Sequence, residues 1–472
     1  MSQKTRASEE LPEGLGGAEA WPGGLVVPVP AEAAAAVRLP YGVRDYLPAA
    51  AARRRGIAEG LLGEFERWGY RRIITPMFEY EAVLGRGLGR ATRAQAVRFV
   101  EPTSGEVVAL RPDITPQVAR LVATRLASEP GPLRLAYEGS VVRLGGSALG
   151  GSAEGQRELF QAGVELVDMP APAGDVEVIA LAGAALEAAG LRRYTIDLAE
   201  ISVVRAALGG IAGAALGPLE RAVAKKDVEE VERQARGLDL EPGRRRLLAA
   251  LPSLYGGPEV LDRAQGLLEE IEDTAALSAL AGLAAVVRLL LQMDPAWEAR
   301  LAIDLGEVRG FDYYTGLRFQ GYAPGVGAAL VSGGRYDHLI ERYGRRRGGA
   351  AGFAVDVERV AEALDAHGVP HAARPSGVLV AGDLCVASQL ARALRAGGTR
   401  VVQELDRGST DEALRTRAAQ AGLAHVLVLE PSGQGGRWLS VENGIEGTIP
   451  EPALAAALAA AQTRLDALVT AR

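Results

Sequence analysis

A succession of short strand-like runs without helical crossovers is the feature that most constrains the fold of this chain. Between residues 97 and 165 the runs are Val97–Val100, Val107–Leu110, Leu133–Val142 and Leu159–Glu165, and glycines break them apart. One helical pattern, at about residues 116–126, interrupts them. Because a parallel sheet needs regular helical crossovers, this succession predicts an antiparallel sheet in an α+β domain.

Composition and periodicity divide the chain into further parts. Residues 1–37 are rich in Gly, Pro, Ala and Glu without sustained periodicity, which predicts a flexible extension. The sheet domain is expected to comprise residues 38–200 and 298–367. Between its two parts, residues 201–297 show an almost continuous helical pattern and are interpreted as a helical insertion. After a Gly- and Pro-rich linker, residues 376–472 alternate strand and helix, which predicts a small α/β unit.

Cysteine, histidine and charge exclude several classes of protein. The one cysteine, Cys385, excludes an intramolecular disulfide framework, and with four histidines there is no thiolate zinc site. No run of about 18 apolar residues lacks a charge or a turn signal, so we expect no membrane span. The N-terminus does not have the pattern of a secretory signal. These features favour a cytoplasmic protein, and the net charge of -7 argues against a general nucleic-acid binder.

The run Arg309–Gly316, Arg-Gly-Phe-Asp-Tyr-Tyr-Thr-Gly, contains several residues that are suited to binding a small polar ligand. The Arg309 guanidinium offers paired donors to a carboxylate. Tyr313 and Tyr314 offer flat apolar walls with polar tips, which suit an imidazole. By spacing alone, an ordinary strand with an exposed polar face is an equal alternative. The run Ser332–Asp337 is predicted to open a helix, 335–343, and to orient this pocket.

Two other runs place polar side chains where a ligand is able to meet them. Asp113 and Thr115 stand just before a proline-initiated helix, where N-capping is the competing interpretation and the better one for Thr115 alone. Gln161 and Glu165 lie four residues apart on one strand, so both are expected on the same face. A buried carboxylate there needs a partner, and an ammonium, an imidazole or a structural arginine would each serve.

The sequence around Arg143 is poor in phosphate-binding features. After Arg143 no cation occurs until Arg157, and the chain contains no G-x-x-x-x-G-K-[ST] motif. The glycines at 325 and 327 lack the third glycine of a dinucleotide fingerprint. Arg359 is positioned either to meet an anion or to remain a solvated helix charge.

Taken in order, these runs resemble the histidyl-tRNA synthetase family of class II synthetases over residues 39–367. The runs that resemble its histidine-specific motifs are Arg309–Gly316 and Gly333–Asp337. The runs that resemble the three class motifs are Gly69–Glu79, Tyr137–Glu165 and Gly352–Arg359. The resemblance implies a six-stranded antiparallel sheet flanked by helices, and a dimer.

The resemblance also assigns roles to individual residues. The family's contacts to the histidine amino group fall on Asp113, Thr115 and Gln161. Its contact to the carboxylate falls on Arg309. Its contacts to the imidazole fall on Glu165 and Tyr314, with Tyr313 beside them. Residues 145–155, which correspond to the synthetase loop that clamps ATP, carry no cation. Asp356 stands where that family has glycine, so Arg143 and Arg359 remain only as residual anion-binding residues.

The run 110–120 more closely resembles a paralogous family, the regulatory subunits of ATP phosphoribosyltransferase. This resemblance implies a non-catalytic subunit, without cofactor or metal, that assembles with a short catalytic subunit for the first step of histidine biosynthesis. It also implies feedback by free histidine and a homodimer within a hetero-octamer. Residues 376–472 resemble an anticodon-binding domain, but nine Arg, no Lys and ten acids make tRNA an unexpected partner. The alternatives are an active histidyl-tRNA synthetase and a free-standing histidine-binding module.

Overall fold

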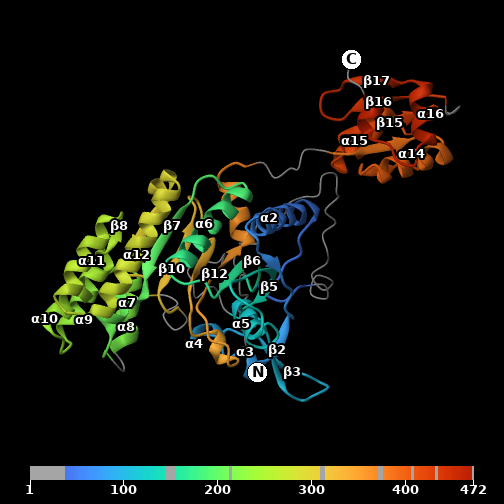
Figure 1. Ribbon diagram of the computed structural model, residues 1–472. Coiled ribbons are helices and arrows are strands. Elements are labelled where there is room, and N and C mark those ends of the chain that lie inside the picture. Colours follow the sequence, from blue (N-terminus) through green and yellow to red (C-terminus); the bar gives the residue numbers. More distant parts are fainter. Residues whose placement is uncertain are drawn as a thin grey trace, which may run out of the picture. The chain divides into compact units, whose positions relative to one another are not determined.

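The computed structural model describes residues 38–144, 156–211, 215–308, 314–369, 376–405, 409–430 and 434–469. Its backbone divides into two compact units, one spanning Leu39–His371 and the other containing the chain from Ala372 onward (Figure 1). Arg309, Tyr313 and the extension 1–37 lie outside the described residues. The two units are described separately below.

A large mixed sheet forms the centre of the first unit, and within the described residues it has nine strands in the order β1-β5-β6-β12-β11-β10-β7-β9-β8. The strands are β1 (Arg71–Arg72), β5 (Leu133–Val142), β6 (Glu158–Val167), β7 (Thr195–Glu200), β8 (Tyr255–Gly256), β9 (Leu301–Asp304), β10 (Leu317–Tyr322), β11 (Val331–Arg335) and β12 (Ala350–Asp356). The six neighbouring strands from β5 to β7 pair with one another in antiparallel orientation only, as the sequence predicted. Outside these six, β1 pairs parallel with β5 and β9 pairs parallel with β7, and β8 pairs antiparallel with β9 at the edge.

Two of the four strand-like runs between residues 97 and 165 belong to another sheet. β3 (Arg98–Val100) and β4 (Val107–Leu110) join β2 (Phe78–Tyr80) in a small antiparallel sheet. The short helices α3 (Glu81–Leu84) and α4 (Arg90–Ala94) connect β2 to β3. Strand propensity alone therefore identified these strands without showing which sheet they join.

One face of the large sheet carries the main hydrophobic core. The helices α2 (Pro48–Arg67), α6 (Ala173–Ala188) and α13 (Val357–Ala366) cover it (Figure 1). Phe65 of α2 meets Phe353 of β12 edge to face, with ring centroids 5.7 Å apart. The opposite face is covered near β5 by α5 (Thr115–Thr124), which packs Ile114 and Val118 against Tyr137. This second face carries the polar side chains described below.

The predicted helix 335–343 is wrong. The chain extends as β11 up to Arg335 and then forms turns and a short 3-10 helix, Ile340–Arg342. Arg335 donates to Asp175 at 2.8 Å, and the Asp337 amide donates to the Thr315 hydroxyl at 3.0 Å. These bonds hold the segment against β10 and α6 in an extended form, which local propensity does not reveal.

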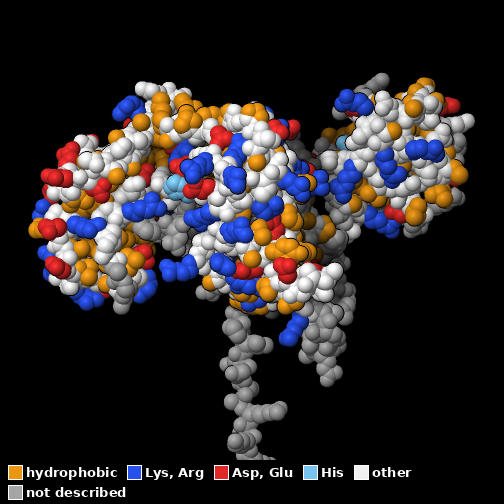
Figure 2. Space-filling view, turned by 60° about the horizontal axis from the view of Figure 1, so that its bottom comes forward, with side chains coloured by type: hydrophobic (Ala, Val, Ile, Leu, Met, Phe, Trp, Pro, Cys, Tyr) orange, Lys and Arg blue, Asp and Glu red, His pale blue; other side chains and the backbone are white. Residues whose placement is uncertain are grey.

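Residues 201–297 form a mainly helical module that packs beside β7 and β9. Its helices are α7 (Ile201–Leu208), α8 (Leu216–Ala224), α9 (Val228–Arg236), α10 (Pro242–Ala250), η2 (Leu251–Ser253), α11 (Glu259–Glu269), α12 (Thr274–Met293) and η3 (Pro295–Ala299). On the face seen in Figure 2, acidic and basic side chains are interspersed over this module. By length and composition alone α12 could cross a membrane, but one such helix is weak evidence, and six of its residues are buried in the core.

The second unit is a smaller α/β structure. In its described part, five strands pair in the order β14-β13-β15-β16-β17, with the first three parallel. The elements are β13 (Val378–Ala381), α14 (Leu384–Ala396), β14 (Val401–Gln403), α15 (Asp411–Gln420), β15 (His425–Leu429), β16 (Gly436–Ser440), β17 (Glu446–Ile449), α16 (Glu451–Ala459) and η5 (Leu465–Ala467). Separate apolar clusters cover the two faces of this sheet.

Candidate functional site

The strand register brings polar residues from distant parts of the chain together on the second face of the large sheet. Glu165 of β6 pairs with Gly352 of β12, and Gly352 pairs in turn with Gly334 of β11. Tyr137 of β5 pairs with Gly163, two residues before Glu165. Since directly paired residues share a face, Tyr137 and Glu165 project from the same side of the sheet.

Glu165 lies at the centre of this arrangement and is only 2% exposed. Neither of its carboxylate oxygens finds a hydrogen-bond partner of good geometry among the described residues, and the same holds for the Tyr137 hydroxyl. Burial raises the pKa of Glu165 well above its usual range, and the nearby Asp113 carboxylate raises it further. Nearby hydroxyls on Thr115 and Tyr137 act in the opposite direction. Among the described residues, the site therefore offers this buried acid nearby hydroxyls but no charged or well-aligned partner of the kind that burial requires.

Glycines keep the space around this acid open. A side chain at Gly352 would overlap a carboxylate oxygen of Glu165. At Gly163, a Cβ atom would lie 2.6 Å from the Tyr137 hydroxyl. Because these are closer than real Cβ contacts, the two glycines are needed for the acid and the phenol to stand side by side on the sheet.

Asp113 and Thr115 reach the site from the start of α5. The Thr115 amide donates to the Asp113 carboxylate at 3.3 Å, and Thr115 is the first residue of the helix, after Ile114 at the N-cap. The N-cap interpretation of Thr115 is therefore wrong. Burial raises the pKa of Asp113, and the Arg143 charge partly opposes this increase. The Asp113 charge raises the pKa of Glu165, so Glu165 lies within electrostatic range of Asp113.

Tyr314 completes the described part of the site. Its ring packs against Gly334, where an added Cβ would lie 2.7 Å from a ring carbon. Burial raises the pKa of Tyr314 to about 12, the Arg318 charge lowers it, and Asp113 and Glu165 raise it. Tyr314 thus lies within electrostatic range of both acids. Arg309 and Tyr313, which the sequence placed beside it, lie outside the described residues.

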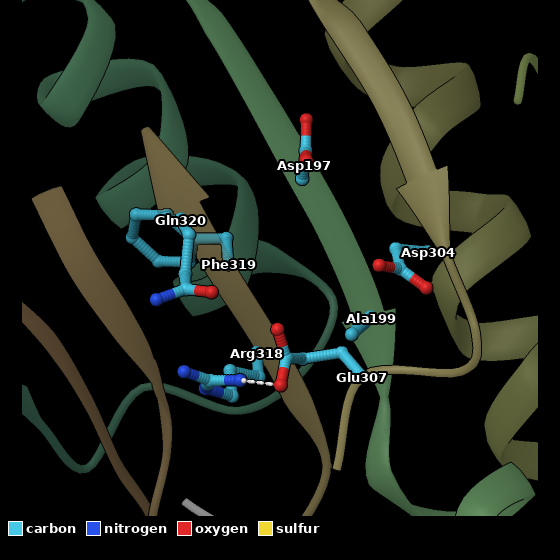
Figure 3. A pocket seen from close by; sticks show the side chains of 7 residues that line it. All are labelled: Asp197, Ala199, Asp304, Glu307, Arg318, Phe319 and Gln320. Carbon is cyan, nitrogen blue, oxygen red and sulfur yellow. Dashed lines mark ion pairs between the residues drawn. The ribbon is translucent and has the colours of Figure 1, made fainter. Parts of the chain in front are cut away.

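Arg318 and Glu307 form a buried pair that the sequence analysis missed (Figure 3). This pair lies next to Tyr314. Arg318 is 1% exposed and lies 3.1 Å from Glu307, and its guanidinium is 5.7 Å from the centre of the Tyr314 ring. With its amide nitrogen turned toward Glu307, Gln320 donates to that carboxylate at 3.1 Å. The cavity beside them has a volume of about 10 Å³, enough for one water molecule but not for an organic ligand. We therefore interpret this pair as support for Tyr314.

Arg143 and Arg359 lie further along the same face, around Asp356. Both arginines are 8% exposed, so the solvated-charge interpretation of Arg359 is wrong. The Arg359 guanidinium lies 3.3 Å from the Asp356 carboxylate. Burial lowers the pKa of Arg143, and the Asp356 charge partly opposes this decrease. Burial raises the pKa of Asp356 to about 6, with Arg359 opposing the increase. Gln161 pairs in register with Asp356 and projects from the same face as Glu165, as predicted.

Within the described ranges, no group of three or more His, Cys, Asp or Glu side chains is arranged to hold a metal ion. The site instead combines a deep carboxylate, a second acid, two tyrosines and an amide. These groups offer several hydrogen-bond acceptors close together, which suits a ligand that brings several N–H donors.

Comparison with known proteins identifies the family of the chain. The histidyl-tRNA synthetase family profile matches residues 42–360. The chain is 38% identical over 397 residues to a Geobacter sulfurreducens protein named ATP phosphoribosyltransferase regulatory subunit, covering 83% of this chain and 88% of that one. A Moorella thermoacetica protein of the same name is 40% identical over 391 residues, which is 82% of this chain and 97% of the relative.

Solved structures give the same result. A Bacillus halodurans C structure described as an ATP phosphoribosyltransferase regulatory subunit/histidyl-tRNA synthetase matches with a TM-score of 0.69 and 30% identity, covering 83% of this chain and 98% of that one. Histidyl-tRNA synthetase from Nostoc sp. PCC 7120 matches with a TM-score of 0.72 at 18% identity, covering 89% and 98%, which supports the fold alone. The fold is thus that of a class II histidyl-tRNA synthetase-like protein. Within that class, the chain belongs to the ATP phosphoribosyltransferase regulatory subunits.

Proposed function

We propose that this protein is a non-catalytic regulatory subunit of ATP phosphoribosyltransferase that binds free histidine on the polar face of its large sheet. The observation that supports this proposal most strongly is the buried, unpaired Glu165 beside Tyr137, since a ligand N–H group would supply the missing partner. In this proposal the imidazole meets Glu165 and Tyr314, and the ammonium group meets Asp113, Thr115 and Gln161. Arg309 would bind the carboxylate, with Tyr313 beside it.

A histidine ligand matches the charges and shapes of the site. Its imidazole and ammonium groups are both N–H donors, and the described site offers two acids near one another. An amino acid with an apolar side chain would leave Glu165 buried without a partner, which costs about 1–3 kcal/mol or more for a charged group. This difference supports selection of histidine over apolar amino acids of similar size.

The arrangement around Asp356 supports the absence of catalysis. The two arginines that would hold ATP in a synthetase face a carboxylate of the chain itself. The stretch 145–155, where the synthetase places further cations, contains neither Lys nor Arg. A negative carboxylate near the phosphate positions opposes nucleotide binding. Histidine would therefore act as a signal in this site and not as a substrate.

Regulation requires that histidine bind two states of the complex with different affinities. A coupling free energy of about 1–3 kcal/mol is typical and corresponds to roughly 5- to 150-fold. We propose that the chain works in the cytoplasm as a homodimer within a hetero-octamer with the short catalytic subunit. Residues 376–472, with a net charge of -1, would not bind tRNA.

The proposal is tested by mixing the purified chain with a short-form catalytic subunit and measuring phosphoribosyl transfer with and without histidine. We expect the chain to raise the activity and histidine to lower it. If histidine leaves the activity of the complex unchanged, the regulatory proposal is wrong. Histidine-dependent ATP–pyrophosphate exchange by the chain alone would instead identify an active histidyl-tRNA synthetase, whereas histidine binding without either activity would indicate a free-standing binding module.

A further inference from the structure

Arg205 of α7 reaches out of the helical insertion to the backbone that carries Tyr314. Its guanidinium donates from Nη2 to the Tyr314 carbonyl at 2.8 Å and from Nη1 to the Thr315 carbonyl at 3.4 Å. These partners lie 109 and 110 residues further along the chain. The contact therefore joins the insertion directly to the segment that leads into β10.

The helix α7 gives Arg205 a fixed support. It packs against α10 and α12 of the same module, and Val203 and Val204 belong to the main hydrophobic core. Its buried residues are Ile201, Val203, Val204, Ala206, Ala207 and Leu208, whereas Arg205 is exposed. Because close packing on most sides holds the helix in place, the guanidinium reaches the Tyr314 backbone from a defined position.

The end of β11 holds the same backbone from another direction. The Thr315 amide donates to the Arg335 carbonyl at 2.8 Å. The Thr315 hydroxyl accepts from the Asp337 amide at 3.0 Å and donates to the Asp337 carboxylate at 3.2 Å. These bonds act on Thr315, whereas Arg205 also bonds to the carbonyl of Tyr314 itself. Tyr314 thus stands between an anchor on β11 and an anchor on α7.

The placement of this backbone determines where the Tyr314 hydroxyl points. The ring packs against Gly334, and an apolar contact of this kind tolerates a small shift. A hydrogen bond from the hydroxyl to a ligand does not, since its strength falls steeply with distance and angle. Loss of one anchor is therefore expected to affect the hydroxyl contact before it affects the packing of the ring.

We propose that Arg205 positions Tyr314 for histidine binding and thereby couples the helical insertion to the histidine pocket. The inference rests on the proposed function, which assigns Tyr314 to the imidazole, and it adds the residue through which the insertion acts on that site. Arg205 touches no ligand and is a positioning residue. Because coupling is reciprocal, histidine that favours one placement of Tyr314 also favours the matching placement of Arg205 and α7.

A double-mutant cycle on the full chain tests whether Arg205 acts through the Tyr314 hydroxyl. Histidine affinity is measured by isothermal titration calorimetry for the parent, Arg205→Ala, Tyr314→Phe and the double variant. We expect Arg205→Ala to weaken binding by about 3- to 30-fold, within the range typical of residues that act on a site without touching the ligand. In the Tyr314→Phe background the same change should alter the affinity by less than about twofold, because the positioned hydroxyl is absent.

Arg263→Ala is the matched control for a general loss of structure. Arg263 is an exposed arginine of α11 in the same module, and it donates to the Ser253 carbonyl at 3.2 Å and to the Ser253 hydroxyl at 2.8 Å. Its replacement removes a comparable pair of bonds that stay within the module. We expect it to change Tm as much as Arg205→Ala does, while histidine affinity stays within about twofold of the parent.

Three results would overturn the inference. The first is an Arg205→Ala protein that binds histidine as tightly as the parent. The second is an equal effect of Arg205→Ala with and without the Tyr314 hydroxyl, which would show that Arg205 does not act through it. The third is equal weakening by Arg263→Ala, which would show a general structural effect. A parent chain that does not bind histidine would instead contradict the proposed function, and this inference with it.

Discussion

Replacing Glu165 by glutamine is expected to make the protein more stable and its histidine binding weaker. The side chain is 2% exposed, and neither carboxylate oxygen has a hydrogen-bond partner of good geometry in the described residues. Because burial raises the pKa of Glu165 well above its usual range, folding at neutral pH must either bury a charge or take up a proton, and an amide of the same shape removes that cost. Leaving a polar group unsatisfied costs about 1–3 kcal/mol, and more when it is charged, so we expect a gain of about 1–3 kcal/mol in the free energy of unfolding.

The effect on binding has the opposite sign. A hydrogen bond to a charged group is worth about 1.5–3 kcal/mol, so Glu165→Gln should weaken histidine binding by roughly 10- to 150-fold. Isothermal titration calorimetry measures the affinity, and a thermal melt measures the stability. For a unit of this size, each kcal/mol moves Tm by about 2 °C, so an increase of about 2–6 °C is expected.

Glu200→Gln is the matched control. Glu200 is also a buried acid of the large sheet with a raised pKa, caused first by burial, but it lies on the opposite face at the end of β7, where it accepts from the Ser202 amide at 3.0 Å. Its replacement should leave histidine affinity within about twofold of the parent. The assignment of Glu165 to the pocket is refuted if Glu165→Gln binds histidine as tightly as the parent, or if both variants weaken binding equally.

Four further results are expected. Tyr314→Phe removes a hydroxyl near both site acids and should weaken histidine binding by about 2- to 12-fold, measured by calorimetry. Asp175→Ala removes the nearer of two carboxylates from the buried Arg335, which keeps Asp337 at 3.2 Å, and should cost about 1.5–3 kcal/mol in urea unfolding. The pKa of Asp356 is raised to about 6 from an ordinary 3.8, so protonated Asp356 stabilises the fold fully below pH 4, and this stabilisation is lost as pH rises through 6. The loss is on the order of 3 kcal/mol in the free energy of unfolding, and it should be absent from the pH profile of Asp356→Asn. Removal of residues 376–472, which belong to a separate compact unit, should leave histidine affinity within twofold by calorimetry.

The sequence predicted the elements that carry a strong local signal. The strand-like run predicted at residues 133–142 has the bounds of β5 in the structure, and the run predicted at 159–165 covers most of β6. The strand period of two also predicted correctly that Gln161 and Glu165 share a face. Both inferences depend only on residues that are close together along the chain.

Features that depend on strand order were not predictable in the same way. Tyr137 belongs to the site because β5 pairs with β6 in a register that sets it opposite Gly163, and nothing local to Tyr137 indicates this. Arg318 is an arginine inside a strand, where sequence alone does not show that Glu307 will meet it in the interior. Long-range pairing, and not propensity, decides both cases.

In the proposed function, two carboxylates on one sheet face explain how a synthetase-like fold binds histidine without catalysing aminoacylation. Both Glu165 and Asp356 are buried, but their surroundings differ: Asp356 already has a guanidinium and a backbone amide, whereas Glu165 has no such partner among the described residues. A buried acid that the chain has satisfied gains nothing from a ligand and excludes anions of its own sign. An unsatisfied one gains most from a ligand that brings N–H groups. In the proposed function the same chemical group therefore opposes nucleotide binding at one end of the site and favours histidine at the other, so variants at position 165 should change histidine affinity and variants at position 356 should leave it unchanged.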